Sequence, residues 1–198
     1  ILSLVLSPII ALVTGYFVMI LLLWLFGRYF GPTFLNTSFK RMQLISASLM
    51  SFSHGSNDAQ KAMGIITLAL LSAGQIPSLE VPTWVKLACA MAMGLGTAAG
   101  GWKIIKTMGT RIFRMEPING FAADLNSALV IFTATFLHLP VSTTHVVSGS
   151  IMGVGSAKRV TAVRWTTARQ MVFAWLLTIP ASGVTSAITY LVMNWLFL

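Results

Sequence analysis

The chain has 198 residues, of which 56% are hydrophobic and only 9% are charged, and its mean hydropathy is +0.84. Uncharged apolar runs long enough to cross a bilayer recur along it, so the composition predicts an all-α integral membrane protein and excludes an ordinary soluble domain. The formal net charge of +9 would suggest a nucleic-acid partner in a soluble protein. Here the Lys and Arg residues lie mainly in short segments between apolar runs, where they report membrane orientation. We therefore expect a lipid bilayer as the surroundings and no nucleic-acid partner.

The first two apolar stretches differ in character. Residues 1–27 carry no charge and are rich in Leu, Ile and Val, which is typical of a spanning helix. The next stretch, 42–73, is interrupted near its middle by the polar residues 54–61, with Gly55 and Gly64 beside them. This pattern predicts a broken helix in the membrane.

A neutral loop is expected over 74–82, followed by a third span over 83–101. Within that span Gly96 and Gly100 form a GxxxG pair, which indicates close helix packing and gives a hint of a homodimer. Residues 102–115 then alternate basic and apolar side chains, a pattern typical of an amphipathic helix in the membrane interface.

Beyond residue 116 the sequence contains three apolar segments separated by a turn and a basic loop. Residues 117–139 and 140–156 are expected to pair as a hairpin that enters the membrane and turns back, because the second is too short and polar for an ordinary span. A basic loop is expected over 157–169. The final run, 170–198, is expected to be kinked or broken near Pro180.

Three basic segments set the expected orientation: 28–41, 102–116 and 157–169. Lys and Arg in short loops are retained on the cytoplasmic side, so all three should lie there and the neutral loop 74–82 should lie outside.

Two polar motifs, 54–61 and 142–145, lie inside this apolar sequence, and such groups are costly in hydrocarbon unless they have a function. Secondary transporters build ion sites from discontinuous helices, whose starts expose backbone N–H groups and whose ends expose carbonyls. We expect Ser142, Thr143 and Thr144 at the start of a short helix, with their hydroxyls and N–H groups facing an oxyanion.

Three further side chains are candidates for a cation site. Asn57 and Asp58 supply hard oxygen ligands suited to Na+. Asp124 has no basic neighbour within a helical turn, so its buried carboxylate is also expected to bind a cation or a proton. Together with the oxyanion site, these residues suggest symport. Alternatives remain: Asp58 and Lys61, three residues apart, could form a purely structural ion pair, and the Ser-Thr-Thr run could serve only to join helices.

Two other classes of function find less support. Ser, His and Asp are all present, but neither a G-x-S-x-G elbow nor a metal-binding H-E-x-x-H occurs, so we predict no enzyme activity, no catalytic residue and no cofactor. The charged rings or carbonyl filter sequence of a channel are not visible either.

Residues 54–64 (HGSNDAQKAMG) resemble the G-[AS]-N-D-A signature of the inorganic phosphate transporter (PiT) family. Residues 140–145 (PVSTTH) are similar to the hairpin motif of the same repeat, and the similarity extends over essentially all of the chain. The sequence departs from the family at Ser56, where Ala is common, and at Asp124, where Glu is expected.

The resemblance implies one half of an inverted-repeat transporter, the C-terminal repeat. It would be a single transmembrane domain over 1–198, with about six membrane segments that include broken helices and a re-entrant hairpin. The N-terminal repeat would come from sequence outside these residues, which begin without Met, or from a second copy of this chain.

The resemblance further implies a secondary transporter that moves inorganic phosphate by symport with Na+ or H+. It places Asn57, Ser142, Thr143 and Thr144 around the phosphate, with Asn57 and Asp58 around a cation such as Na+. We expect a multi-pass protein of the cell membrane, the inner membrane of a prokaryote. Transport of sulfate or another oxyanion, or a half-protein that has lost transport, remain alternatives.

Overall fold

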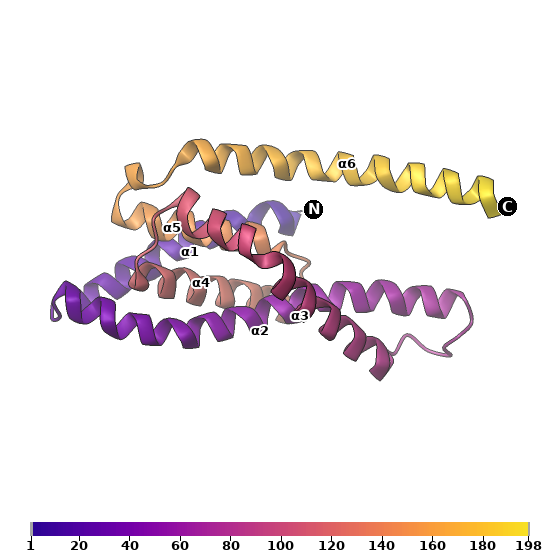
Figure 1. The fold of residues 1–198 in the computed structure, drawn as a ribbon, viewed down its shortest axis with the longest axis horizontal. Coiled ribbons are helices and arrows are strands. Elements are labelled where there is room, and N and C mark those ends of the chain that lie inside the picture. The colour runs from indigo at the N-terminus through magenta and orange to yellow at the C-terminus, as the bar shows by residue number, and fades with distance from the viewer. Residues whose placement is uncertain (1, 198) are drawn as a thin grey trace. The chain divides into compact units, whose positions relative to one another are not determined.

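The computed structural model describes residues 2–197, apart from the side chains of residues 32, 33, 103, 104, 107 and 197. The described residues contain helices and no strand, which confirms the predicted all-α fold (Figure 1). The helices are α1 (Leu2–Phe26), α2 (Pro32–Ser72), α3 (Thr83–Lys106), α4 (Pro117–Phe136), α5 (Thr143–Lys158) and α6 (Trp165–Phe197). A π-helical segment, Thr107–Ile112, follows α3, and a 3₁₀ turn, Val160–Ala162, follows α5.

The chain divides into two compact units, Ile1–Val163 with α1 to α5 and Arg164–Leu198 with α6. Among the described residues, two helices are long and apolar enough to cross a membrane: α1, with a mean hydropathy of 2.6, and residues 165–196 of α6, with 1.6. The single transmembrane domain and the total of about six membrane segments therefore stay predictions.

In the first unit, α1 and α5 pack with their backbones in close approach. A Cβ added to Gly149 would lie 2.4 Å from Pro8 O, and one added to Gly153 would lie 2.1 Å from Leu12 O. Because both pairs advance by four residues on each helix, α1 and α5 run parallel. No side chain larger than that of glycine fits at these two positions, which form the small-residue contact that brings membrane helices together.

The glycine pair predicted to pack closely, Gly96 and Gly100 of α3, instead faces open space. The prediction of close packing was wrong for the described chain, because a GxxxG spacing marks a smooth helix face but does not identify a partner. The homodimer that this pair hinted at stays a prediction.

Helix α2 runs for 41 residues without interruption, so the break predicted at residues 54–61 is absent. The segment contains no Pro, and glycine within a helix costs only about 1 kcal/mol relative to Ala. Its polar side chains reach partners on neighbouring elements without unwinding the helix, as described below. The helix also begins at Pro32, so most of the expected loop 28–41 is helical, and α6 continues through Pro180.

Helices α2 and α4 contact each other and run parallel. The rings of Phe39 and Phe121 are 5.2 Å apart near the helix starts, and Asn57 hydrogen-bonds Thr135 near the end of α4. On α2 the buried residues Phe39, Ser46 and Ser53 recur every seven residues. This period keeps one face of α2 against α4, as in other near-parallel helix pairs.

Helices α4 and α5 form the predicted hairpin, with a turn over 137–142. His138 has a φ of 56°, and the N–H groups of His138 and Leu139 bond to Thr135 O at 3.0 Å and Ala134 O at 2.8 Å. These two bonds are those of a Schellman motif, which ends α4. The turn lies beside the middle of α2, which continues from Asp58 for about another 20 Å. A re-entrant hairpin turns back inside the membrane, so its turn must lie beside the middle of a neighbouring helix and not at that helix's end.

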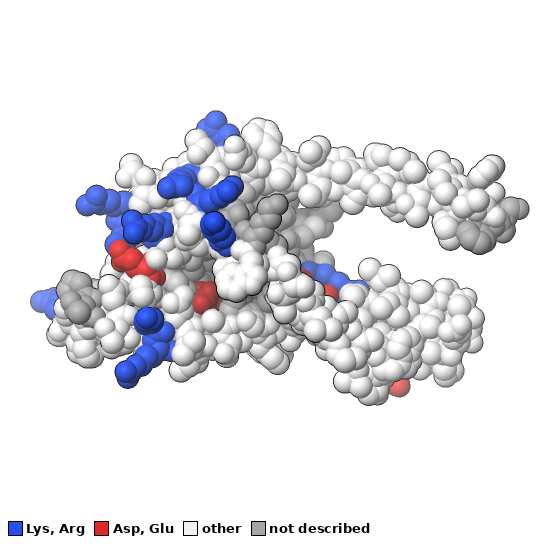
Figure 2. Space-filling model, viewed as in Figure 1, with Lys and Arg blue, Asp and Glu red and all other residues white. Residues whose placement is uncertain are grey.

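The basic segments of this unit meet at the opposite end of the hairpin. The rings of Phe26 and Phe39 are 5.6 Å apart, which joins the end of α1 to the start of α2. Lys158 Nζ lies 2.5 Å from Glu116 Oε2, which joins the end of α5 to the start of α4. Lys and Arg side chains crowd this end of the unit (Figure 2), as the predicted common side of the basic segments requires.

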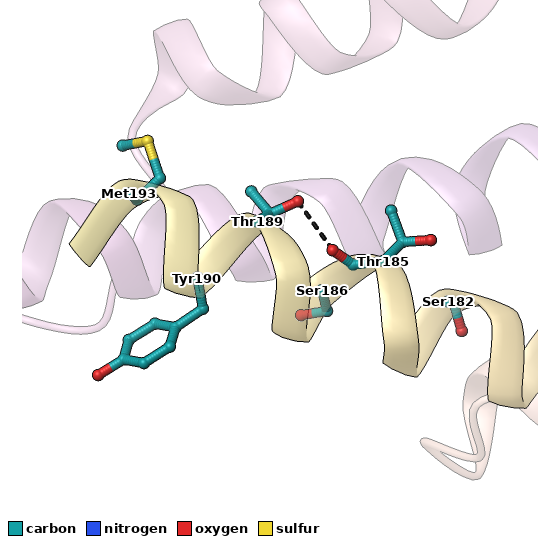
Figure 3. A pocket seen from close by; sticks show the side chains of 6 residues that line it. All are labelled: Ser182, Thr185, Ser186, Thr189, Tyr190 and Met193. Carbon is teal, nitrogen blue, oxygen red and sulfur yellow. Dashed lines mark hydrogen bonds between the residues drawn. The ribbon is translucent and has the colours of Figure 1, made fainter. Parts of the chain in front are cut away.

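Helix α6, described by itself, carries a shallow groove lined by Ser182, Thr185, Ser186, Thr189, Tyr190 and Met193 (Figure 3). Three of its five hydroxyls bond to the backbone of the same helix: Ser182 Oγ to Ile179 O at 2.9 Å, Thr185 Oγ1 to Ala181 O at 2.8 Å and Thr189 Oγ1 to Thr185 O at 2.8 Å. Since these three donors are satisfied locally, they are not available to a ligand.

The α1–α5 contact generates a prediction about stability. Gly153→Ala should destabilise the detergent-solubilised protein by about 1 to 3 kcal/mol, because the added Cβ forces the two backbones apart. Gly96→Ala is the matched control, also in a helix interior, and should be neutral or stabilising by up to about 1 kcal/mol. The thermal unfolding midpoint of each variant measures the effect. Equal midpoints for the two variants would contradict the close approach of α1 and α5.

The orientation is tested by cysteine labelling in a Cys89→Ser background. Ser78→Cys in the neutral loop and Thr161→Cys beside the basic end should react with a membrane-impermeant maleimide from opposite sides of the membrane, Thr161→Cys from the cytoplasm. Labelling of both positions from one side would contradict the predicted topology.

Candidate functional site

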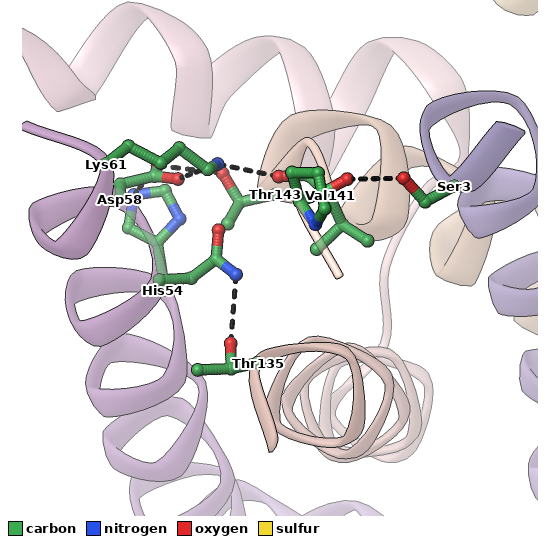
Figure 4. Close-up of polar contacts among 9 residues, drawn as sticks. Ser3, His54, Asp58, Lys61, Thr135, Val141 and Thr143 are labelled. Carbon is green, nitrogen blue, oxygen red and sulfur yellow. Dashed lines mark hydrogen bonds and ion pairs between the residues drawn. The ribbon is translucent and has the colours of Figure 1, made fainter. Parts of the chain in front are cut away.

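The two polar motifs identified in the sequence meet beside the α4–α5 turn (Figure 4). Thr143 Oγ1, at the start of α5, donates to Asp58 Oδ2 at 3.0 Å across 85 residues of sequence. Lys61 Nζ donates to Asp58 Oδ1 at 2.9 Å and to Val141 O at 2.6 Å. The ion pair between Asp58 and Lys61 is therefore formed, and it is part of a larger cluster.

Asn57 contributes an oxygen atom that lacks a protein partner. The residue is only 4% exposed, and its Nδ2 donates to Thr135 Oγ1 at 2.9 Å. Its Oδ1 is buried and accepts no hydrogen bond from the described residues. Buried polar atoms are nearly always satisfied, so an unpartnered amide oxygen in this cluster is a candidate ligand for a hard cation.

The start of α5 supplies the other half of the cluster. The first helical hydrogen bond runs from Val146 N to Ser142 O at 3.0 Å, so the amides of Thr143 and Thr144 precede it. Helix N-termini carry partial positive charge and are ready-made anion sites. Of the three predicted residues, Thr143 is buried in the cluster, Ser142 is half-buried and does not cap the helix with its side chain, and Thr144 is exposed.

Two histidines lie near the cluster in different roles. His54 Nε2 is 3.7 Å from Asp58 Oδ2, which is too long for a hydrogen bond. His145, on α5, hydrogen-bonds the backbone of Leu4 in α1. That bond fixes His145 to a neighbouring helix.

Asp124 lies apart from this cluster. It is 11 residues before Thr135 on the same helix, or about 16 Å along the axis. Ser46 Oγ donates to its Oδ2 at 3.4 Å, and it forms no ion pair with a described residue. The structure does not bring Asp124 together with Asp58, and its cation role stays a prediction for a separate position.

Sequence reasoning missed three members of the site: Thr135, the carbonyl of Val141, and Ser3, whose Oγ donates to Pro140 O at 2.8 Å. Thr135 lies in an apolar stretch, and nothing in its sequence context indicates that it belongs to a site. The Pro140–Val141 carbonyls belong to the predicted turn, where carbonyls free of helical bonds are expected.

A second buried polar group has a structural function. Asn126 Nδ2 donates to Ala11 O at 2.9 Å and to Ser150 Oγ at 2.8 Å, so it ties α4 to both α1 and α5. Such interhelical bonds contribute roughly 0.6 kcal/mol each in membrane proteins.

Comparison with known proteins gives a consistent result. The phosphate transporter family matches residues 1–186. A probable low-affinity inorganic phosphate transporter of Bacillus subtilis (strain 168) is 52% identical over 98% of this chain and 59% of its own length. One from Rhizobium meliloti (strain 1021) is 46% identical over 95% of this chain and 56% of its own. The chain thus spans somewhat more than half the length of these relatives.

A solved structure, described as the sodium-dependent phosphate transporter, superimposes with a TM-score of 0.73 and 35% identity. It covers 83% of this chain, which corresponds to 42% of that structure. These relatives are named as transporters and not as enzymes. The family match extends through both polar motifs and all five helices of the first unit. This chain therefore belongs to the phosphate transporter family and is a membrane protein.

Proposed function

We propose that this chain forms the C-terminal repeat of a secondary transporter that moves inorganic phosphate across the cell membrane together with Na+ or H+. The observation that carries the proposal is the hydrogen bond between Thr143 and Asp58. It joins an anion-binding helix start to a carboxylate, so opposite charges can be bound side by side. The names of the relatives, which specify inorganic phosphate, support the choice of substrate.

The phosphate would bind at the start of α5. There the backbone amides of Thr143 and Thr144 supply donors, and the helix dipole favours negative charge. The hydroxyl of Thr143, which donates to Asp58 Oδ2 in this structure, would turn to the phosphate when the anion binds. Ser142, which precedes Thr143, and Asn57, which precedes the Asp58 that Thr143 contacts, would complete the shell. Donors held on a rigid helix bind a tetrahedral oxyanion without first being ordered.

The cation would bind between the phosphate and Asp58. Two unit charges of like sign about 4 Å apart repel by roughly 4 kcal/mol at an effective dielectric constant of 20, and more for a dianion. A carboxylate beside phosphate is therefore tolerable only with positive charge between them. Asn57 Oδ1, buried and without a protein partner, supplies a second oxygen ligand for that cation.

Two further features complete the proposal, a second repeat and the membrane in which the protein lies. The site would be completed by an N-terminal repeat of inverted topology. The protein would be multi-pass in the cell membrane, the inner membrane of a prokaryote, in keeping with its bacterial relatives.

Thr143→Val tests the anion site in the complete product of the gene that encodes this chain. Losing one hydrogen bond to a charged group should cost about 1.5 to 3 kcal/mol, or roughly tenfold or more in phosphate affinity. Affinity is measured as the concentration of radiolabelled phosphate that half-saturates uptake into proteoliposomes.

Two variants control this experiment. Thr143→Ser keeps the hydroxyl and should retain most of the affinity. Thr67→Val removes a buried hydroxyl on a different helix, α2. This hydroxyl bonds only to Met63 O, at 2.7 Å, so its loss should leave phosphate affinity unchanged. Unchanged affinity in Thr143→Val would place the anion site elsewhere.

Asp58→Asn tests cation coupling, because it keeps the shape of the side chain and removes its charge. Uptake driven by a Na+ gradient or by a proton gradient should fall by about tenfold or more, since a cation loses its charged ligand. Glu116→Gln removes the charge of another paired carboxylate, at the basic end, and should leave uptake nearly unchanged. Normal cation dependence in Asp58→Asn would exclude Asp58 from coupling.

A further inference from the structure

Lys61 is held in the middle of the candidate ion site. It follows Asp58 by one helical turn on α2, and its Nζ lies 2.9 Å from Asp58 Oδ1 and 2.6 Å from Val141 O (Figure 4). The Lys61 side chain is 43% exposed, whereas Val141, whose carbonyl accepts from it, is only 3% exposed. The ammonium group therefore bridges α2 to the α4–α5 turn.

The atoms that accept from Lys61 are those that bind metal cations. A carboxylate oxygen and a backbone carbonyl at the edge of a helix are hard ligands for Na+ and similar ions. Two further oxygens belong to the same cluster, Thr143 Oγ1 on Asp58 Oδ2 and the unpartnered Oδ1 of Asn57. Nζ and a free cation cannot occupy the position between Asp58 Oδ1 and Val141 O at the same time.

The charges around this position favour the Lys61 ammonium in place of a free cation. The Asp58 carboxylate lies 2.9 Å from Lys61 Nζ and 3.7 Å from His54 Nε2. Thr143 of α5, which donates to Asp58, is neutral, and so is Thr135 of α4, which bonds the neighbouring Asn57. With Lys61 in place, the carboxylate is already neutralised before any ion arrives from solution.

Lys61 also has an advantage of concentration over a free ion. A group attached by a short flexible linker is present at its site at an effective concentration in the mM range or above. Its single positive charge is covalently retained, whereas Na+ must be taken from solution at each cycle.

We infer that Lys61 is a tethered cation that takes one of the cation positions of the phosphate site, and so lowers the number of free cations that phosphate binding requires. The inference rests on the proposed function. Lys61 thereby acts as a specificity-determining residue, which sets how strongly uptake depends on Na+ at a given phosphate concentration.

The test compares wild type with Lys61→Met in proteoliposomes at fixed neutral pH, using radiolabelled phosphate and replacing NaCl by choline chloride. The measured quantity is the ratio of uptake at saturating Na+ to uptake without Na+. We expect this ratio to rise by about tenfold or more in Lys61→Met, the change that one charge-assisted hydrogen bond makes in a binding constant. The apparent Hill coefficient for Na+ should rise with it.

Lys61→Arg keeps the positive charge and should retain a ratio near that of wild type. Lys86→Met is the matched control, because Lys86 is exposed on α3 and forms no ion pair with a described residue; its ratio should equal that of wild type. If Lys61→Met does not insert, Lys61→Gln replaces it in the same measurement.

Two results would overturn the inference. One is an equal Na+ ratio in wild type and Lys61→Met. The other is loss of uptake at every Na+ concentration in both Lys61→Met and Lys61→Arg, with normal amounts of inserted protein, which would show that Lys61 serves another purpose. Failure of the proposed function is distinct, because wild type would then transport no phosphate at any Na+ concentration.

Discussion

The bond between Asp58 and Thr143 determines where the α4–α5 hairpin stops along α2. Together with the Asn57–Thr135 and Lys61–Val141 bonds, it ties the turn to one level of a helix that continues well beyond it. In surroundings of low dielectric each of these groups is costly without its partner, so the hairpin cannot slide along α2 without losing all three contacts. The start of α1 is then fixed as well, because Ser3 bonds the turn and Gly149 and Gly153 bring α1 against α5. The polar cluster therefore fixes the position of the hairpin and is also a candidate ion site.

The sequence alone predicted the helical fold, the hairpin and the start of α5, because these depend on hydropathy and on Pro140, which are local signals. It did not predict that α2 is continuous through residues 54–61. Polar residues flanked by glycine look the same in a broken helix and in an intact one whose side chains have partners, and those partners lie about 80 residues away in sequence. The sequence also did not predict that Thr143 is buried while its neighbour Thr144 is exposed. Adjacent residues on a helix are rotated by about 100°, so only one of the two side chains faces the cluster.

Buried polarity has two different origins in this fold. Asn126 donates through Nδ2 to both Ala11 O and Ser150 Oγ, so it joins three helices. Asn57 donates through Nδ2 to Thr135, and its buried Oδ1 has no hydrogen-bond partner among the described residues. Sequence position cannot separate these cases, because both are asparagines in apolar helices. Their hydrogen bonds distinguish them, because no side-chain atom of Asn126 is both buried and unpartnered, whereas the buried Oδ1 of Asn57 is free to accept from or coordinate a ligand.

The charge of the cluster depends on very few atoms. The ammonium of Lys61 makes one of the three bonds that tie the turn to α2, whereas the Asn57–Thr135 and Asp58–Thr143 bonds do not involve it. Its long, flexible side chain can leave Asp58 and Val141 O without moving the backbone of α2. On the inferred role of Lys61, the number of free cations that phosphate binding requires would therefore change through one side chain, while the bonds from Asn57 and Asp58 and the close contact of α1 with α5 would be kept.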